Sequence, residues 1–167
     1  IGKPMPMVDG PEKISGKAQF TADFYDHNAL TGYIKRAEVA HAKILSVDTS
    51  VAEALPGVHA VITGSETDEG HGVLPIARTE LPIAFDKVRY KGEPVAAVAA
   101  DTIKIAKQAS DLIKIEYELL PAYFDARSAM EENAVDLHHH RPGNIERHVD
   151  FEIGDVDKGF LEADLIH

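Results

Sequence analysis

The sequence predicts an α+β fold with a mixed sheet, one main helix and one or two short helices. Three neighbouring patterns support this prediction. Residues 95–100 contain no polar side chain, which is typical of a strand covered on both faces. Residues 105–113 repeat apolar side chains at helical spacing, and residues 113–119 then alternate apolar and charged side chains. Strand, helix and strand in this order form one compact β-α-β piece.

The residues around the apolar run predict how it begins and ends. Val88 and Tyr90 alternate with charged residues, as in a half-buried strand. The turn Gly92-Glu93-Pro94 breaks that strand, because glycine adopts backbone angles that other residues avoid and proline lacks a backbone donor. Asp101-Thr102 then offers side-chain oxygens that can cap the main helix.

The N-terminal half predicts an arm, several strands and one short helix. Residues 1–16 are rich in Gly, Pro and Lys and predict an extended arm with turns at 9–11 and 15–16. Asp48-Thr49-Ser50 offers three candidate N-caps for a helix over 51–55, which Pro56-Gly57 ends. Residues 40–43 are ambiguous. The other predicted elements are an extended piece at 20–23, a turn at 26–28 and strands at 30–36, 44–47 and 58–62.

The remaining segments predict loops and a second, incomplete unit. Residues 63–72 and 131–150 lack apolar periodicity, so we expect both to be mobile. Residues 72–77 are apolar but contain Pro75, which suits a covered loop or an edge strand. The last predictions are a short helix at 125–130, a strand at 151–153, a helix beginning at Asp155 and a cut-off strand at 165–166. A strand cut off in this way leads us to expect that the chain is part of something longer.

Composition restricts the possible functions. The net charge is -11, from 17 basic and 28 acidic residues, and such a surface repels nucleic acid. The sequence has no cysteine, which excludes disulfides, thiolate zinc sites and cysteine-held iron–sulfur clusters within this chain. No apolar run approaches the roughly 20 residues of a membrane span, so no membrane partner is expected.

The histidine triplet His138-His139-His140, with His148 nearby, is the most visible metal-binding candidate. Imidazole is a common ligand for zinc and related metals. Three adjacent histidines cannot all face one ion from a regular element, and no cysteine assists them. The sequence therefore favours a solvated loop over a metal site at these histidines.

Three glutamates are candidates for acid–base chemistry. Glu116 and Glu118 are two residues apart, so a strand places both on one face, as paired catalytic carboxylates can be. Lys114 shares that face, which favours an ordinary solvated surface. Glu93 lies in the turn before the apolar run, where burial could raise its pKa and give it a functional role. Capping of backbone amides in the turn is the favoured interpretation.

Two common motifs are missing from the sequence. The turn entering the main helix, Ala100-Asp101-Thr102, has no glycine, so it cannot be a G-x-G-x-x-G phosphate loop, and a dinucleotide-binding fold is disfavoured. No G-x-S-x-G nucleophile elbow is present either. We therefore assign no catalytic, cofactor-binding or metal-binding residue from the sequence.

Five stretches, taken together, resemble the N-terminal region of the large, molybdenum-bearing subunit of the xanthine dehydrogenase/aldehyde oxidase family. Their order and spacing match across residues 1–130, the region called the α/β hammerhead domain. Residues 72–77, 120–123 and 144–145 are most similar to the 4-hydroxybenzoyl-CoA reductase branch of the family. The five stretches are Val8-Asp9-Gly10 with Lys13 and Gly16; Tyr33 to His41; Asp48-Thr49-Ser50 with Ala54-Leu55-Pro56-Gly57-Val58; Val88-Arg89-Tyr90 with Gly92-Glu93-Pro94-Val95-Ala96; and Glu116-Tyr117-Glu118 with Leu120-Pro121-Ala122.

The resemblance implies a hammerhead domain over 1–130, a connector over 131–150, and, over 151–167, the first element of a truncated molybdopterin-binding domain. The implied parent enzyme is an oxidoreductase acting on an aromatic substrate such as 4-hydroxybenzoyl-CoA. It would use molybdopterin-molybdenum, iron–sulfur clusters and FAD in other domains or subunits. The family's catalytic positions have no counterpart in this chain. We therefore expect a structural and assembly role, with no cofactor and no activity in the chain alone.

The implied partners are the remainder of the molybdenum subunit and the iron–sulfur and flavin subunits, in the cytoplasm. A second interpretation is a stand-alone, non-catalytic interaction module with the same fold. The gene beyond His167 separates the two, because an open frame for a large cofactor domain supports the first and a stop codon supports the second.

Overall fold

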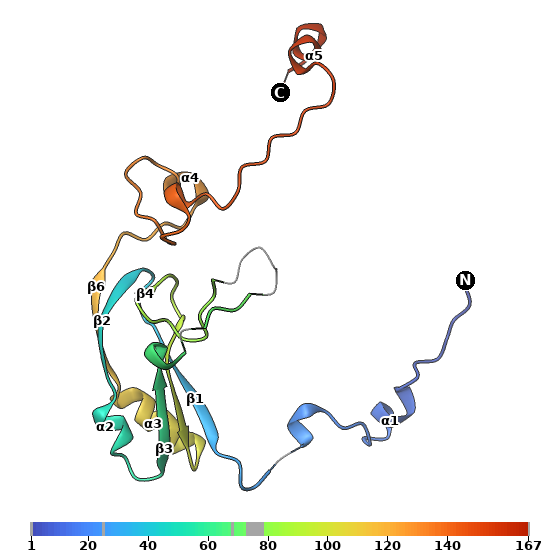
Figure 1. Ribbon diagram of the computed structural model, residues 1–167. Helices are drawn as coiled ribbons and strands as arrows, with labels where there is room; N and C mark the ends of the chain where they lie inside the picture. Colours follow the sequence, from blue (N-terminus) through green and yellow to red (C-terminus); the bar gives the residue numbers. More distant parts are fainter. Residues whose placement is uncertain (1, 25, 68, 73–78, 167) are drawn as a thin grey trace.

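The computed structural model describes residues 2–24, 26–67, 69–72 and 79–166. In this part of the chain, two three-stranded sheets pack with one main helix, and several short helices surround them (Figure 1). The α+β fold class is confirmed. The strands are β1 Thr31–Arg36, β2 Ala42–Asp48, β3 Val58–Thr63, β4 Lys87–Val88, β5 Pro94–Ala100 and β6 Lys114–Leu119. The helices are α1 Gly10–Ile14, α2 Ser50–Glu53, α3 Ile103–Leu112, α4 Ala126–Ala129 and α5 Val156–Glu162, with 3₁₀ turns at Thr21–Asp23, Gly64–Glu66 and Pro142–Asn144.

The apolar strand β5 is the middle strand of the first sheet, which has the order β1-β5-β3 with both pairings antiparallel. Ala96, Val98 and Ala100 are buried in one cluster with α3, whereas Val95 is buried in a second cluster. The predicted burial of this strand on both faces is therefore confirmed. Small side chains along β5 allow α3 to lie directly on the sheet.

Helix α3 begins where the sequence predicts. The Thr102 hydroxyl accepts a hydrogen bond from the Ile105 amide at 3.3 Å, as a helix N-cap does. Ala106 and Ala109 are buried on the predicted face. Ser110 is buried beside them, and the apolar pattern did not identify it.

The second sheet has the order β4-β2-β6 and is also antiparallel. In β6 the residues Ile115 and Tyr117 are partly buried and alternate with exposed charged residues, as predicted. Strand β4 ends at Val88 instead of continuing to Tyr90. The reason is that the Arg89 amide donates to the carboxylate of Glu93 and not to a neighbouring strand.

The residues predicted to form one core divide between two clusters, because the two faces of β5 lead away from each other. The first cluster contains Val98, with Ile105, Leu112 and Ile115 packed at its edge. The second contains Val95, with Tyr117 at its edge. Ile115 packs against both clusters and so joins them.

The N-terminal arm contains more helix than its sequence indicates. The turn predicted at 9–11 is instead the start of a one-turn helix, α1, in which Pro11 lies in the first turn, where proline needs no backbone donor. Lys13 pairs with Asp9 one turn earlier at 2.6 Å. The extended piece predicted at 20–23 is wrong, because it forms a 3₁₀ turn in which Asp23 accepts from the Phe20 amide.

At the other end of the chain the helix prediction is confirmed and the strand predictions are wrong. The Asp155 carboxylate caps α5 by accepting from the Lys158 amide at 2.9 Å. Residues 151–153 and 165–166 form no strand, because no described strand lies beside them to supply ladder hydrogen bonds. The prediction for 72–77 falls almost wholly outside the described residues, and the mobility of 63–72 and 131–150 stays a prediction.

The segment predicted to be a connector, residues 131–150, contacts β4 through its first half. The Asn144 side chain donates to the carbonyls of Ala129 and Val135 and accepts from the Leu137 amide, at 2.7–3.1 Å. The Lys87 ammonium reaches from β4 to the Asp136 carbonyl at 2.9 Å. These bonds place residues 137 and 138 beside the turn that precedes β5.

Candidate functional site

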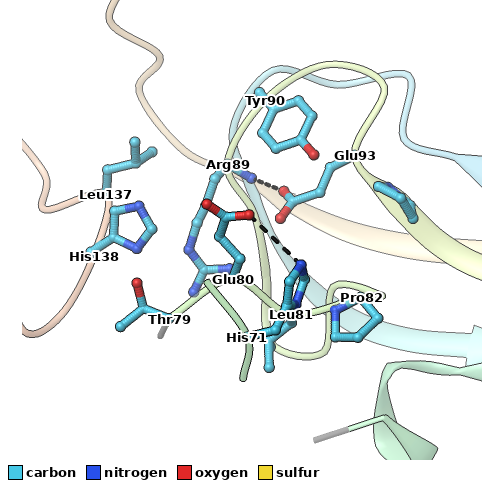
Figure 2. A pocket seen from close by; sticks show the side chains of 11 residues that line it. His71, Thr79, Glu80, Leu81, Pro82, Arg89, Tyr90, Glu93, Leu137 and His138 are labelled. Atoms are coloured by element: carbon cyan, nitrogen blue, oxygen red, sulfur yellow. Dashed lines mark hydrogen bonds and ion pairs between the residues drawn. The ribbon is translucent and has the colours of Figure 1, made fainter. Parts of the chain in front are cut away.

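A cleft of about 860 Å³ opens between the turn before β5, the segment 79–82 and the connector. Figure 2 shows its walls, with the turn residues Arg89, Tyr90 and Glu93 facing His138 across the opening. The complete lining is His71, Thr79, Glu80, Leu81, Pro82, Arg89, Tyr90, Glu93, Pro94, Leu137 and His138.

The turn that forms one wall depends on a glycine. Gly92 has a φ of +93°, in the left-handed region that other residues rarely adopt. Its amide donates to the Ala37 carbonyl at 2.9 Å, and the Glu93 amide donates to the Tyr90 carbonyl at 3.2 Å. The turn therefore presents the side chains of residues 89 to 93 in a fixed arrangement.

Glu93 is the buried acid of this wall, with 8% of its surface exposed. Its carboxylate accepts a hydrogen bond from the Arg89 backbone amide (Figure 2). Burial raises the pKa of Glu93, while the amide hydrogen bonds and the Arg89 charge oppose that rise. Capping of the turn, the interpretation favoured from the sequence, is confirmed.

The Arg89 guanidinium also lines the cleft and already has partners. It donates to the Lys87 carbonyl at 2.9 Å and to the Asp86 carboxylate at 3.2 Å. Its Nε is buried and has no hydrogen-bond partner among the described residues. Arg89 therefore holds the turn and β4 together more than it offers charge to a ligand.

The opposite rim carries an imidazole and a carboxylate. His71 and Glu80 form an isolated antiparallel bridge, with backbone hydrogen bonds of 2.8 and 3.1 Å in the two directions. Their side chains approach to 3.8 Å and are both well exposed (Figure 2). An exposed pair at this separation supplies a polar rim and little binding energy.

The histidine triplet lies at the edge of the cleft, and its rings do not converge on one point. The rings of His138 and His139 both lie near that of His140, with centroid separations of 5.5 and 5.1 Å. Burial, followed by the charges of Arg89, His140 and Lys87, lowers the pKa of His138. His148 lies away from the triplet in sequence and is exposed. Among the described residues, no three histidine, aspartate or glutamate side chains are grouped to hold a metal.

The paired glutamates of β6 lie on the solvated face, as the sequence favoured. Glu116 accepts from the Ser46 hydroxyl at 3.0 Å, and Glu118 pairs with Lys43 at 2.9 Å. Both partners belong to β2, so these contacts are cross-strand pairs of the second sheet. They form no part of the cleft.

Sequence reasoning did not single out His41, which lines a second cavity of about 340 Å³. The His41 side chain is almost fully buried, and its Nδ1 bonds to the Pro121 carbonyl at 2.5 Å. A carbonyl only accepts, so Nδ1 carries the proton. Tyr90, Tyr123 and Phe124 also line this cavity. The partner of His41 is 80 residues away, and a local pattern cannot reveal such a contact.

Nothing in the cleft forms a catalytic constellation among the residues that the structure describes. Thr79 contributes an aliphatic hydroxyl to the cleft lining, but no hydrogen bond joins that hydroxyl to His71 or His138. The buried acid Glu93 is occupied by the turn it caps. The described lining is that of a partly polar surface depression.

Comparison with known proteins identifies the family. Residues 15–121, more than half of the chain, match the family described as "Aldehyde oxidase and xanthine dehydrogenase, a/b hammerhead domain". The chain belongs to this family. The two sheets and α3 all lie within the matched residues, so the hammerhead domain is the folded unit of Figure 1.

The hammerhead relatives are much longer proteins. The chain is 36% identical over 166 residues to the nicotinate dehydrogenase large molybdopterin subunit of Eubacterium barkeri, covering 99% of this chain and 39% of that subunit. It is 36% identical over 165 residues to the xanthine dehydrogenase/oxidase of Mus musculus, covering 98% and 12%. The solved aldehyde oxidoreductase of Desulfovibrio gigas superposes with a TM-score of 0.77 at 28% identity, covering 96% and 19%. The chain therefore spans well under half the length of these relatives.

The described hammerhead residues do not fit the molybdopterin that one of these relatives is named for. Molybdopterin carries a phosphate, and phosphates favour a glycine loop at a helix N-terminus. Before α3 stands Asp101, whose carboxylate pairs with His59 at 2.7 Å and would repel a phosphate. We therefore derive no chemical step through this group.

No helix in the described part of the chain is long and apolar enough to cross a membrane.

Proposed function

We propose that this chain is the N-terminal hammerhead segment of the large subunit of a molybdenum hydroxylase, with a structural and assembly role. The match of residues 15–121 to the hammerhead family is the observation that supports this most directly. The redox chemistry would then belong to parts of the enzyme outside this chain.

The proposed organisation has three parts. Residues 1–130 are the hammerhead domain, residues 131–150 are the connector, and residues 151–167 are the first element of the molybdopterin-binding domain. The family match ends at residue 121, near the first boundary. The exposed α5, which follows the connector, supports the last assignment, because its apolar side chains need a surface to cover them.

The parent enzyme is proposed to be a cytoplasmic, molybdenum-dependent oxidoreductase. It would hold molybdopterin in the remainder of the large subunit, and iron–sulfur clusters and FAD in other domains or subunits. Relatives named as large or lettered subunits support such an assembly. The net charge of -11 makes nucleic acid an unsuitable partner.

The proposed substrate is aromatic. Relatives are named for nicotinate, xanthine, nicotine and quinoline, which are all nitrogen-containing aromatic compounds. Among aromatic substrates we propose 4-hydroxybenzoyl-CoA, whose reacting ring is phenolic, because residues 120–123 and 144–145 resemble the reductase that acts on it. In that case a phenolic hydroxyl would be removed by two-electron reduction.

The test is to isolate the assembly that contains this chain from its natural host through an affinity tag. We expect the chain to be continuous with, or bound to, a molybdopterin-binding polypeptide, together with iron–sulfur and flavin proteins. Mass spectrometry identifies these partners, and an assay panel with nicotinate, xanthine and 4-hydroxybenzoyl-CoA defines the substrate. A tagged chain that is isolated alone would favour the stand-alone interaction module instead.

A further inference from the structure

The second cavity, of about 340 Å³, is lined by segments that are distant in the sequence. The link between β1 and β2 supplies residues 40 and 41, the turn before β5 supplies residues 89–91, and the segment after β6 supplies residues 122–124. Ala129, Leu137 and Asn144 complete the lining. Small-molecule sites have volumes of about 300–1,000 Å³, so this cavity lies at the small end of their range. Its volume suits a single-ring compound and is too small for an acyl-CoA or a dinucleotide.

His41 gives the cavity a hydrogen-bond acceptor that the described residues leave unused. The residue is only 3% exposed, and Nδ1 donates to the Pro121 carbonyl. No acidic side chain lines the cavity to balance an imidazolium, so the buried ring is neutral and Nε2 carries a lone pair. Nε2 is itself buried and has no hydrogen-bond partner in the described part of the chain. Such atoms in folded proteins are normally paired with protein, water or a ligand.

The rest of the lining defines what kind of ligand would supply the missing donor. The rings of Tyr90, Tyr123 and Phe124 offer aromatic faces and edges for stacking. The two charged lining residues, Arg89 and Lys91, are both basic, which disfavours a cationic ligand. The ligand that matches this lining has an aromatic ring, no positive charge and a hydrogen-bond donor for His41.

Hydrogen bonds hold the cavity wall in place without a ligand. The Tyr123 hydroxyl accepts from the Val135 amide at 3.0 Å. The Asn144 side chain donates to the Ala129 carbonyl at 2.8 Å and to the Val135 carbonyl at 3.1 Å. These bonds join the segment after β6, α4 and residues 131–150 around the cavity. A site that is already formed loses less free energy of binding to ordering when a ligand enters.

We propose that this cavity is a binding site for a small neutral phenol. The phenolic hydroxyl donates to Nε2 of His41, and the ring packs against Tyr123 and Phe124. A phenol fits better than its close analogues, because an aromatic ether has no proton to donate and an alicyclic alcohol has no π face. The inference rests on residues of this chain and goes beyond the proposed structural role. Ordered water is the competing occupant, since water also satisfies buried polar atoms.

The test is a titration of the 167-residue chain with phenol, anisole and cyclohexanol, followed by NMR of the backbone amides and of ¹⁵N-labelled histidine rings. We expect phenol to bind saturably with a Kd near or below about 1 mM, a reasonable affinity for a single-ring compound. Phenol should shift the Nε2 resonance of His41 and the amides of residues 122–124. Anisole and cyclohexanol should bind at least about tenfold more weakly, the first because it leaves Nε2 unpaired.

Two variants place the binding in the cavity. His41→Asn keeps an amide donor for the Pro121 carbonyl but removes the Nε2 acceptor, so it should bind phenol and anisole about equally. Phe124→Ala removes an aromatic wall that is 88% exposed, and should weaken phenol binding severalfold without changing the melting temperature. Phe151→Ala is the matched control, because Phe151 is 81% exposed and does not line the cavity.

The proposal is overturned if phenol produces no saturable shift at His41, which would leave water as the occupant. It is also overturned if the natural chain binds anisole as tightly as phenol, or if Phe124→Ala and Phe151→Ala bind phenol equally. These comparisons use the natural chain and exposed positions, so they decide the question even if His41→Asn does not fold.

Discussion

At the scale of single residues, Glu93 shows how a local pattern can predict a buried polar contact. Glycine and proline on either side of it specify a tight turn, and the nearest orphan amide lies four residues back at Arg89. All the information is therefore within one short stretch. His41 is the opposite case, because its burial depends on Pro121 at a distant place in the sequence. No local pattern specifies that contact.

Replacing Glu93 with alanine leaves the Arg89 amide without its acceptor inside the fold. We expect a loss of about 1–3 kcal/mol in the free energy of unfolding, the usual cost of an unsatisfied buried polar group. Glu93→Gln keeps an acceptor oxygen and should lose less. Denaturant midpoints measure the difference. Glu116→Ala, on the exposed face of β6, is the control and should change stability by about 0.5 kcal/mol at most.

His138 predicts a pH dependence with a defined sign. Its pKa is lowered in the folded state, so the unfolded chain takes up the proton more readily. The stability contributed by the neutral ring is present above the ordinary pKa of 6.5 and is lost as the pH falls below it. His138→Gln should therefore lose less stability than the natural chain on acidification to about pH 5.5. Urea midpoints at several pH values test this, with exposed His139→Gln as the control. Identical acid losses in the natural chain and His138→Gln would contradict it.

At the scale of elements, the sequence identifies most strands and helices but not their partners. The continuous apolar run of β5 and the periodicity of α3 and β6 are local properties, and the structure confirms all three elements. The assignment of β5 and β6 to different sheets depends on pairing with distant strands. The partners in β1 and β2 lie 58–77 residues earlier, and those in β3 lie 33–42 residues earlier. The failed strand at 151–153 has the same cause, because an alternating pattern forms a strand only where a partner is available.

The cap of α3 gives a prediction at this scale. Thr102→Ala removes the side-chain acceptor for the Ile105 amide, and helix caps of this kind contribute about 1 kcal/mol. Thr102→Ser keeps the hydroxyl and should stay close to the natural chain. Thermal melts of the pair measure the contribution. Equal melting of the alanine and serine variants would show that the hydroxyl does not cap the helix.

At the scale of the whole molecule, the two core clusters meet across β5 and Ile115, so a charge in β5 should affect the entire domain. Val98→Asp buries a carboxylate among apolar side chains, at a cost of several kcal/mol. A domain of this size is stabilised by only about 5–15 kcal/mol, so the variant should be largely unfolded or insoluble. Leu119→Asp, at an exposed position of β6, should remain folded by circular dichroism. A Val98→Asp protein that melts like the natural chain would show that β5 is not the centre of the fold.

We propose that the folded hammerhead domain works within a larger molybdenum enzyme whose cofactors lie outside this chain. The most direct measurement is the molybdenum and iron content of the purified 167-residue chain, beside that of the assembly isolated from the natural host. We predict no stoichiometric molybdenum or iron in the chain alone, and one molybdenum per copy of the chain in the assembly. Stoichiometric metal in the chain alone, or an assembly without molybdenum, would contradict the claim.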